Sequence, residues 1–197
     1  MKNMKAKDII VPAAALFIIC LISSVLLALT NNVTAEKIEQ NSIETAIASR
    51  AQVLPSVGDV KVASYGEDVT DEESGITYCT GLDESGNVIG YLFTSAAKGY
   101  GGDVKVMTGF DLEGNIVGFT VLDCSGETPG LGQNAKKESF MSRFIGKNGE
   151  LTVNKNSNDG QNIQAITAAT ITSKAVVKAV NASSELFAEI TGGALNG

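Results

Sequence analysis

The feature that most constrains this chain is an apolar stretch near its N-terminus. Residues Ile9 to Leu29 form a run of 21 residues that contains no charged side chain. An α-helix rises about 1.5 Å per residue, so a helix of this length crosses the hydrocarbon core of a bilayer. The sequence therefore predicts a transmembrane helix at residues 9–29.

Charge on one side of this stretch predicts its orientation. Residues 1–8 carry three lysines and one acid, and basic residues are retained on the cytoplasmic side of membranes. We expect residues 1–8 to be cytoplasmic and everything after Asn31 to be extracytoplasmic. The alternative is a cleaved signal peptide, because Val33-Thr34-Ala35 is a small-residue cleavage site. Apolar cores of signal peptides run only about 7–15 residues, which favours the uncleaved anchor.

A second helical pattern follows the apolar stretch. Thr34 can cap a helix that continues to about Gln52, and Pro55 ends it. Apolar residues recur on one side of this segment, so we expect residues 30–56 to form a stalk helix. These residues are Ile38, Ile43, Ala46, Ile47 and Leu54.

The next part of the chain is rich in residues that favour β-strands. Strands are predicted at Val60–Tyr65, Ile76–Thr80 and Val88–Thr94. A phrase with a Gly-Asn turn occurs twice, since Asp111–Phe119 parallels Asp83–Tyr91. Two hairpins in series are therefore expected, and they imply a mainly antiparallel sheet.

Helical and irregular segments return after the sheet. Residues 135–145 predict a helix that carries Phe140 and Phe144 on one face, and residues 151–153 predict a short strand. Residues 154–162 are polar and predict an exposed loop. The fold class is therefore α+β, with one extracytoplasmic domain at residues 57–197 and flanking helices.

A last helix is predicted near the C-terminus, with Thr172 or Ser173 as its cap and Gly192-Gly193 as its stop. Its apolar residues recur at helical spacing and are Ala175, Val176, Ala179, Val180, Leu186, Phe187 and Ile190.

Composition excludes several classes of chemistry. The chain has no His, which excludes His-based triads and His ligation of zinc or haem. Its three cysteines, Cys20, Cys79 and Cys124, are far apart in sequence, so we expect no iron–sulfur cluster and no metal site. Cys79 and Cys124 are either a disulfide or buried thiols. The net charge of -7 argues against a nucleic-acid partner. If this chain transfers electrons, an organic cofactor must therefore carry them.

The most informative stretch for function is Gln164–Lys174. It places hydroxyls and small residues before the predicted helix, whose N-terminus offers free N–H groups and a positive dipole to an anion such as phosphate. The hydroxyl of Thr170 can hydrogen-bond a phosphate or be esterified by one, and Ala168 and Ala169 leave room beside it. The same run is also an ordinary small-residue approach to a capped helix.

Two glycine-rich segments are candidates to accompany Thr170. Gly99–Gly102 could let the backbone approach a planar ring on which Tyr100 stacks, or it could be a plain crossover between hairpins. Glu127-Thr128-Pro129-Gly130-Leu131-Gly132 is a second such segment, which could equally be a rigid Pro-Gly turn.

Two of these segments resemble motifs of the FMN-binding domain family. Thr167-Ala168-Ala169-Thr170-Ile171-Thr172 resembles its flavinylation motif, in which a Ser-Gly pair is commoner than Thr-Ala and the Thr after the small pair carries FMN through a phosphoester. The segment at 127–132 matches the family's E-T-P-G-L-G loop letter for letter.

By this resemblance, FMN is joined to Thr170 by a flavin transferase. Thr128 and Leu131 contact the flavin and Glu127 holds the loop. The remaining candidate cofactor-binding residues are Tyr100, Gly130, Gly132, Thr167, Ala168, Ala169, Thr172 and Ser173.

The resemblance extends from about Val57 to Ile190 and, with the N-terminal span, favours the G subunits of Rnf complexes, the ion-translocating ferredoxin:NAD oxidoreductases. The related C subunit of the sodium-translocating NADH:quinone reductase is usually longer. The implied function is electron transfer on FMN among the other subunits of a membrane redox pump, with no catalytic acid or base in this chain. A stand-alone extracytoplasmic flavin reductase and a cofactor-free anchored binding module are the alternatives.

Overall fold

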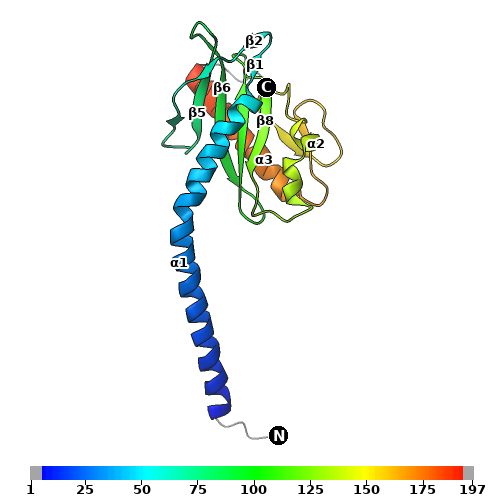
Figure 1. Ribbon diagram of the computed structural model, residues 1–197. Helices are drawn as coiled ribbons and strands as arrows, with labels where there is room; N and C mark the ends of the chain where they lie inside the picture. Colours follow the sequence, from blue (N-terminus) through cyan, green and yellow to red (C-terminus); the bar gives the residue numbers. More distant parts are fainter. Residues whose placement is uncertain (1–5, 193–197) are drawn as a thin grey trace. The chain divides into compact units, whose positions relative to one another are not determined.

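The computed structural model of the chain describes residues 6–192 (Figure 1). These residues form two compact units, one ending at Glu44 and the other beginning at Thr45. Helix α1, Ala6–Val53, contributes to both. The second unit therefore begins inside the segment predicted as a stalk.

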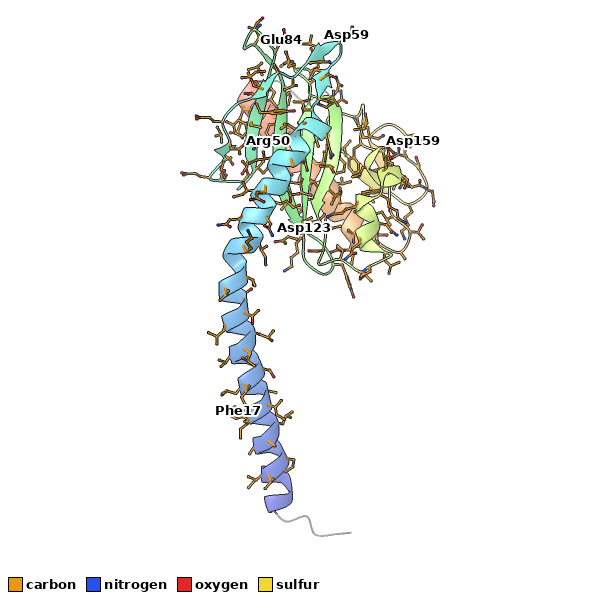
Figure 2. The ribbon with its side chains drawn as sticks, in the orientation of Figure 1. Phe17, Arg50, Asp59, Glu84, Asp123 and Asp159 are labelled. Atoms are coloured by element: carbon orange, nitrogen blue, oxygen red, sulfur yellow. The ribbon has the colours of Figure 1, made fainter. Side chains whose placement is uncertain are left out.

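Residues 10–29 of α1 carry apolar side chains on all sides. Phe17 is 67% exposed and Leu27 is 71% exposed, and Figure 2 shows Phe17 pointing away from the helix. A helix that exposes apolar side chains around its whole circumference is suited to a hydrocarbon environment. Within residues 6–192, α1 is the one helix long and apolar enough to cross a membrane, as the sequence predicts.

The prediction of a separate stalk helix capped by Thr34 is wrong. Helix α1 passes through this position without a break, and the Thr34 hydroxyl donates a hydrogen bond to the Thr30 carbonyl at 2.9 Å. Threonine can bond back to the preceding turn in this way inside a helix, so it need not begin one. The end is predicted correctly, because α1 stops at Val53, shortly before Pro55.

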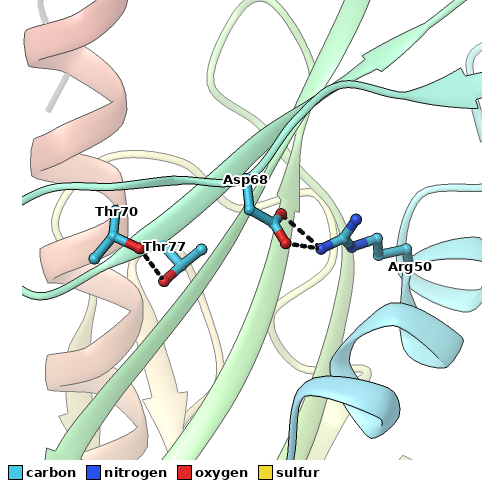
Figure 3. A network of polar contacts seen from close by, with 4 residues as sticks. All are labelled: Arg50, Asp68, Thr70 and Thr77. Atoms are coloured by element: carbon cyan, nitrogen blue, oxygen red, sulfur yellow. Dashed lines mark hydrogen bonds and ion pairs between the residues drawn. The ribbon is translucent and has the colours of Figure 1, made fainter.

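The C-terminal end of α1 buries an apolar side. Ile43 and Ile47 from the predicted stripe are each 52% exposed, whereas Leu54 is fully buried and Ala46 packs against the same cluster. Arg50 joins this end of the helix to the domain, because its guanidinium lies 2.6 Å from the Asp68 carboxylate (Figure 3).

The centre of the second unit is an antiparallel sheet with strand order β3-β5-β6-β7-β8. Its long strands confirm the two predicted hairpins, and the short strand β4 pairs with β5 at one edge. The strands are β3 Ser64–Tyr65, β4 Val69–Thr70, β5 Thr77–Leu82, β6 Val88–Lys98, β7 Asp103–Phe110 and β8 Ile116–Asp123.

The repeated phrase forms the same turn in both hairpins. The Asp83 carboxylate accepts the backbone N–H of Asn87 at 2.8 Å, and Asp111 accepts that of Asn115 at 2.7 Å. The glycine before each asparagine has φ of 82° or 83°, a left-handed conformation that glycine adopts without strain. The two similar sequences therefore make similar structures.

Both faces of this sheet are buried. Alternate residues of a strand point to opposite faces, so neighbouring apolar residues enter two different cores. One core lies under helix α3, Thr170–Thr191, which packs across β6 and β7 (Figure 1). The other lies under the last turn of α1. Phe93, Val106 and Val121 belong to the first core, and Leu92, Met107, Leu122, Val53 and Leu54 to the second.

The single strand predicted at Val60–Tyr65 is two strands. β2, Val60–Lys61, pairs with β1, Ser56–Val57, in a small hairpin, whereas β3 joins the main sheet. The chain changes partner between them, where Val62 donates a hydrogen bond to Pro55 and Ala63 to Leu82.

The helix predicted at 135–145 is shorter and interrupted. A 3₁₀ turn, η1 Gly132–Lys136, is followed by α2, Glu138–Met141, because Lys137 adopts an extended conformation between them. Phe140 and Phe144 are nevertheless both buried, and Phe144 stacks on Phe119 with ring centroids 4.3 Å apart.

A parallel two-stranded sheet precedes α3. The predicted short strand is β9, Thr152–Asn154, and it pairs with β10, Asn162–Gln164, a strand that was not predicted. The loop predicted between them is present at residues 155–161. Helix α3 ends as predicted at Gly192, with φ of 65°. Gly193 lies outside the described residues.

Candidate functional site

Helix α3 begins earlier than predicted. Ala169 is its N-cap, without a side-chain hydrogen bond, and Thr170 is its first residue. The prediction of Thr172 or Ser173 as cap is wrong because both side chains are buried in the first turn. Ser173 instead accepts the N–H of Ile166 and donates to the carbonyl of Ala169, each at 2.9 Å, which ties the preceding turn to the helix.

The turn before α3 contains an unusual backbone conformation. Ala168 has φ of 60°, the one positive φ of a non-glycine residue among those described. Such a conformation costs a residue with a β-carbon about 1–2 kcal/mol. The position where the flavinylation motif usually has glycine is therefore one where glycine would be unstrained.

Glu127 lies beside this turn and is 2% exposed. Its carboxylate accepts hydrogen bonds from the Thr172 hydroxyl and, at 2.9 Å, from the backbone N–H of Gly101. These bonds join three segments that are distant in sequence. The loop at 99–102, the loop at 127–132 and the start of α3 thus meet at one carboxylate.

The pKa of Glu127 reflects two opposing effects. Burial raises it, but the hydrogen bonds from Thr172 and from the backbone of residues 100–102 outweigh burial, so the pKa lies below its usual range. The side chain is therefore ionised at neutral pH.

A cleft of about 470 Å³ opens between these three segments. Its rim carries exposed apolar side chains: Tyr100 is 73% exposed, Ile171 54% and Leu131 40%. Thr170 is half-buried in the wall. The lining residues are Tyr100, Glu127, Thr128, Leu131, Gly132, Ala168, Ala169, Thr170, Ile171 and Thr172.

The structure thus brings together nine of the twelve candidate residues in one cleft. Thr167 and Gly130 instead line an adjoining groove of about 430 Å³, which shares Leu131 and Ala168 with the cleft. Ser173 lines neither groove and is fully buried.

Sequence reasoning missed three residues here. Ile171 projects into the rim of the cleft, and Lys137 and Arg143 line the adjoining groove. Arg143 is held by the Ser139 carbonyl at 2.9 Å and lies 5.5 Å from the centre of the Phe140 ring. No sequence signal distinguishes these residues. Ile171 is an apolar residue at the variable position of the motif, and Lys137 and Arg143 are isolated basic residues.

The cysteines lie outside the cleft. Cys79 and Cys124 are free, buried thiols that belong to the cores on opposite faces of the sheet, so of the two alternatives the disulfide is excluded. Cys20 is free and exposed on α1. Among the described residues, no group of His, Cys, Asp and Glu is arranged to hold a metal ion.

The residues present fit a bound FMN. The exposed apolar side chains at the rim can contact the planar flavin ring, and the N-terminus of the 22-residue helix α3, at Thr170, can bind the phosphate. Consistent with this, residues 99–185 match the FMN-binding domain family, a range that includes all twelve candidate residues.

Over nearly its whole length the chain is 38% identical to the G subunit of the Na⁺-translocating ferredoxin:NAD⁺ oxidoreductase complex of Acetobacterium woodii. The match covers 89% of this chain and 90% of that protein. The chain belongs to this G-subunit family. The G subunit of the proton-translocating complex of Clostridium ljungdahlii is 32% identical, over 90% of this chain and 91% of that protein.

Solved structures support the fold of this member of the G-subunit family. The C subunit of the Na⁺-translocating NADH-quinone reductase of Parabacteroides distasonis superimposes with a TM-score of 0.56 at 20% identity, over 81% of this chain and 98% of that one. NqrC of Shewanella oneidensis gives a TM-score of 0.51 at 17% identity, over 64% and 70% of the chains. These likenesses confirm the α+β fold.

Proposed function

We propose that this chain is the membrane-anchored flavoprotein subunit of an ion-translocating ferredoxin:NAD⁺ oxidoreductase complex of the Rnf type, carrying electrons on FMN joined by a phosphoester to Thr170. The observation that carries the proposal is the convergence of the two flavin-binding motifs in one cleft beside the first residue of α3. FMN supplies the redox chemistry, and the protein supplies binding and electrostatics.

Each part of the cleft has a role in this proposal. The hydroxyl of Thr170 forms the ester, and the N-terminus of α3 stabilises the negative charge that the phosphate retains. Tyr100, Leu131 and Ile171 provide apolar contact to the ring, and Thr128 a polar one. Covalent attachment keeps the cofactor at its site when no pool of free FMN surrounds the domain.

The proposal includes a topology and partners. Residues 1–8, which lie largely outside the described part of the chain, are assigned to the cytoplasm by their lysines, and the domain lies on the outer face of the membrane. Its partners are the other proteins of the complex, and a flavin transferase attaches the cofactor.

The decisive experiment compares Thr170→Val with Thr70→Val, each expressed with a flavin transferase. Thr70 is the matched control, because it is an exposed threonine of β4 that lies outside the motif and lines neither groove. After denaturing electrophoresis, we expect flavin fluorescence in the wild-type and Thr70→Val bands and none in the Thr170→Val band. A dark wild-type band would remove the proposed attachment and favour a cofactor-free binding module.

Protease treatment of spheroplasts checks the topology. We expect the domain to be degraded from outside in intact spheroplasts. Protection until the membrane is broken would place it in the cytoplasm instead.

A further inference from the structure

Glu127 is a buried carboxylate that has only neutral donors. The hydrogen bonds that it accepts come from the Thr172 hydroxyl and from the backbone of residues 100–102, with the Gly101 N–H at 2.9 Å. No ion pair to Glu127 occurs among the residues that the structure describes. Buried carboxylates usually have a cationic partner. Because Glu127 has no such partner among residues 6–192, no adjacent cation compensates its negative charge.

Glycines enclose this carboxylate. A β-carbon on Gly99 would overlap one carboxylate oxygen, and a β-carbon on Gly132 would lie 2.5 Å from the other. The glycine-rich loop at 99–102, expected to let the backbone approach a planar ring, here lets it approach Glu127. Both loops therefore fix the carboxylate in one position in the wall of the cleft that Thr170 also lines.

We propose that Glu127 is a redox-tuning residue, a fixed negative charge in the wall of the cleft that lowers the reduction potential of FMN bound there. The inference rests on the proposed function. Uptake of electrons adds negative charge to the cofactor, and a neighbouring negative charge that is itself shielded from water opposes this uptake. The hydrogen bonds that hold the pKa of Glu127 below its usual range keep this charge in place at neutral pH.

A purely structural role predicts a different result. If Glu127 only held the loops together, an uncharged acceptor of the same length would leave the reduction potential nearly unchanged. If its charge acts on the cofactor, removing the charge raises the potential. Removing a hydrogen-bond donor that partly neutralises this charge lowers the reduction potential.

The test is potentiometric titration of the flavin absorbance in the full-length protein at pH 7.5, after in-gel fluorescence has verified covalent flavin. We expect Glu127→Gln to raise the midpoint potential by at least the equivalent of about tenfold in the reduction equilibrium, roughly 30 mV for a two-electron couple. Thr172→Val removes the hydroxyl donor, while the Gly101 N–H still stabilises the ionised carboxylate, so this variant is expected to lower the midpoint potential. Glu138→Gln is the matched control, because Glu138 is exposed and lines neither groove.

The outcomes separate the two proposals. A wild-type protein without covalent flavin would refute the proposed function. A flavin-bearing Glu127→Gln protein with the wild-type potential, or with the same shift as Glu138→Gln, would overturn the tuning role alone. If Glu127→Gln failed to retain flavin, Thr172→Val titrated at pH 7.5 and at pH 9 would decide, because a midpoint potential at or above that of the wild type at both pH values would contradict the charge effect.

Discussion

The α-carbon of Gly118 packs against the carbonyl group of Val53, so closely that a β-carbon on Gly118 would overlap the carbonyl oxygen. Gly118 lies in β8, directly across from Gly109 of β7. A β-carbon on Gly109 would lie 3.2 Å from the same oxygen. This pair of glycines makes the space in which α1 ends on the sheet.

The first prediction follows from this contact. Gly118→Ala forces the end of α1 away from the sheet, so we expect it to lower the free energy of unfolding by about 2 kcal/mol or more. Gly109→Ala needs a displacement of only a few tenths of an ångström and is expected to cost less. Calorimetry of the detergent-solubilised proteins measures both. Equal losses would contradict the close approach at Gly118.

The second prediction concerns Ala168. Ala168→Gly removes the strain of a positive φ but gives the unfolded chain more freedom, so a net gain of roughly 0.5–1 kcal/mol is expected. Ala165→Gly, at a neighbouring position without positive φ, should lose stability instead. Thermal unfolding of the two variants checks this. A loss in both would show that the backbone at 168 is not strained.

The third prediction tests the loop that carries Tyr100. A β-carbon on Gly101 would overlap the carbonyl oxygen of Gly126, whereas one on Gly102 meets nothing closer than 3.6 Å. We therefore expect Gly101→Ala to displace the loop and to reduce the fraction of protein that carries flavin severalfold. Gly102→Ala should stay near wild type. Absorbance of flavin relative to protein gives the fraction, and equal occupancy of the two variants would contradict the packing.

The fourth prediction concerns Arg50 and Asp68. Their side chains are 15% and 42% exposed, so the pair is partly screened, and a coupling energy of about 0.5–1 kcal/mol is expected. A double-mutant cycle with Arg50→Gln and Asp68→Asn measures it, and high salt should reduce it. The exposed Thr70–Thr77 hydrogen bond of 3.0 Å is the uncharged control, whose coupling should not respond to salt (Figure 3). A coupling for the charged pair that salt leaves unchanged would not be electrostatic.

The fifth prediction is a pH dependence from Cys79. Burial raises the pKa of this thiol from 9.0 to about 11. Between these values the unfolded chain loses the proton while the folded protein keeps it, so stability is complete below pH 9 and falls as the pH rises toward 11. Denaturation midpoints measured across this window should fall less steeply in Cys79→Ala. Parallel pH profiles would refute a buried thiol.

Much of this structure could be predicted because its signals are local. The two hairpins follow from a repeated phrase in which an Asp carboxylate accepts the backbone N–H of an Asn four residues later. Asp83 and Asp111 both make this hydrogen bond. The residues of the cleft could be predicted for a related reason, because its two motifs are short and continuous in sequence. Each motif contributes to the wall of the cleft, one through Thr128 and the other through Thr170.

The rest depends on partners distant in sequence. Nothing near Glu127 indicates that its carboxylate meets Thr172 and Gly101, and nothing near Gly118 indicates that it meets Val53. The cap of α3 was mistaken for the same reason. Thr172 has the chemistry of a cap, but its hydroxyl is used by a residue 45 positions earlier.

The buried first turn of α3 determines how a cofactor on Thr170 could move. Thr172 and Ser173, just beyond the attachment point, are 1% and 0% exposed and hydrogen-bonded to neighbouring segments. The proposed ester would therefore attach the flavin to a rigid helix turn, unlike carriers whose cofactor is on a long flexible tether. Electron exchange would then depend on how closely a neighbouring redox centre approaches Thr170, and hardly at all on linker length.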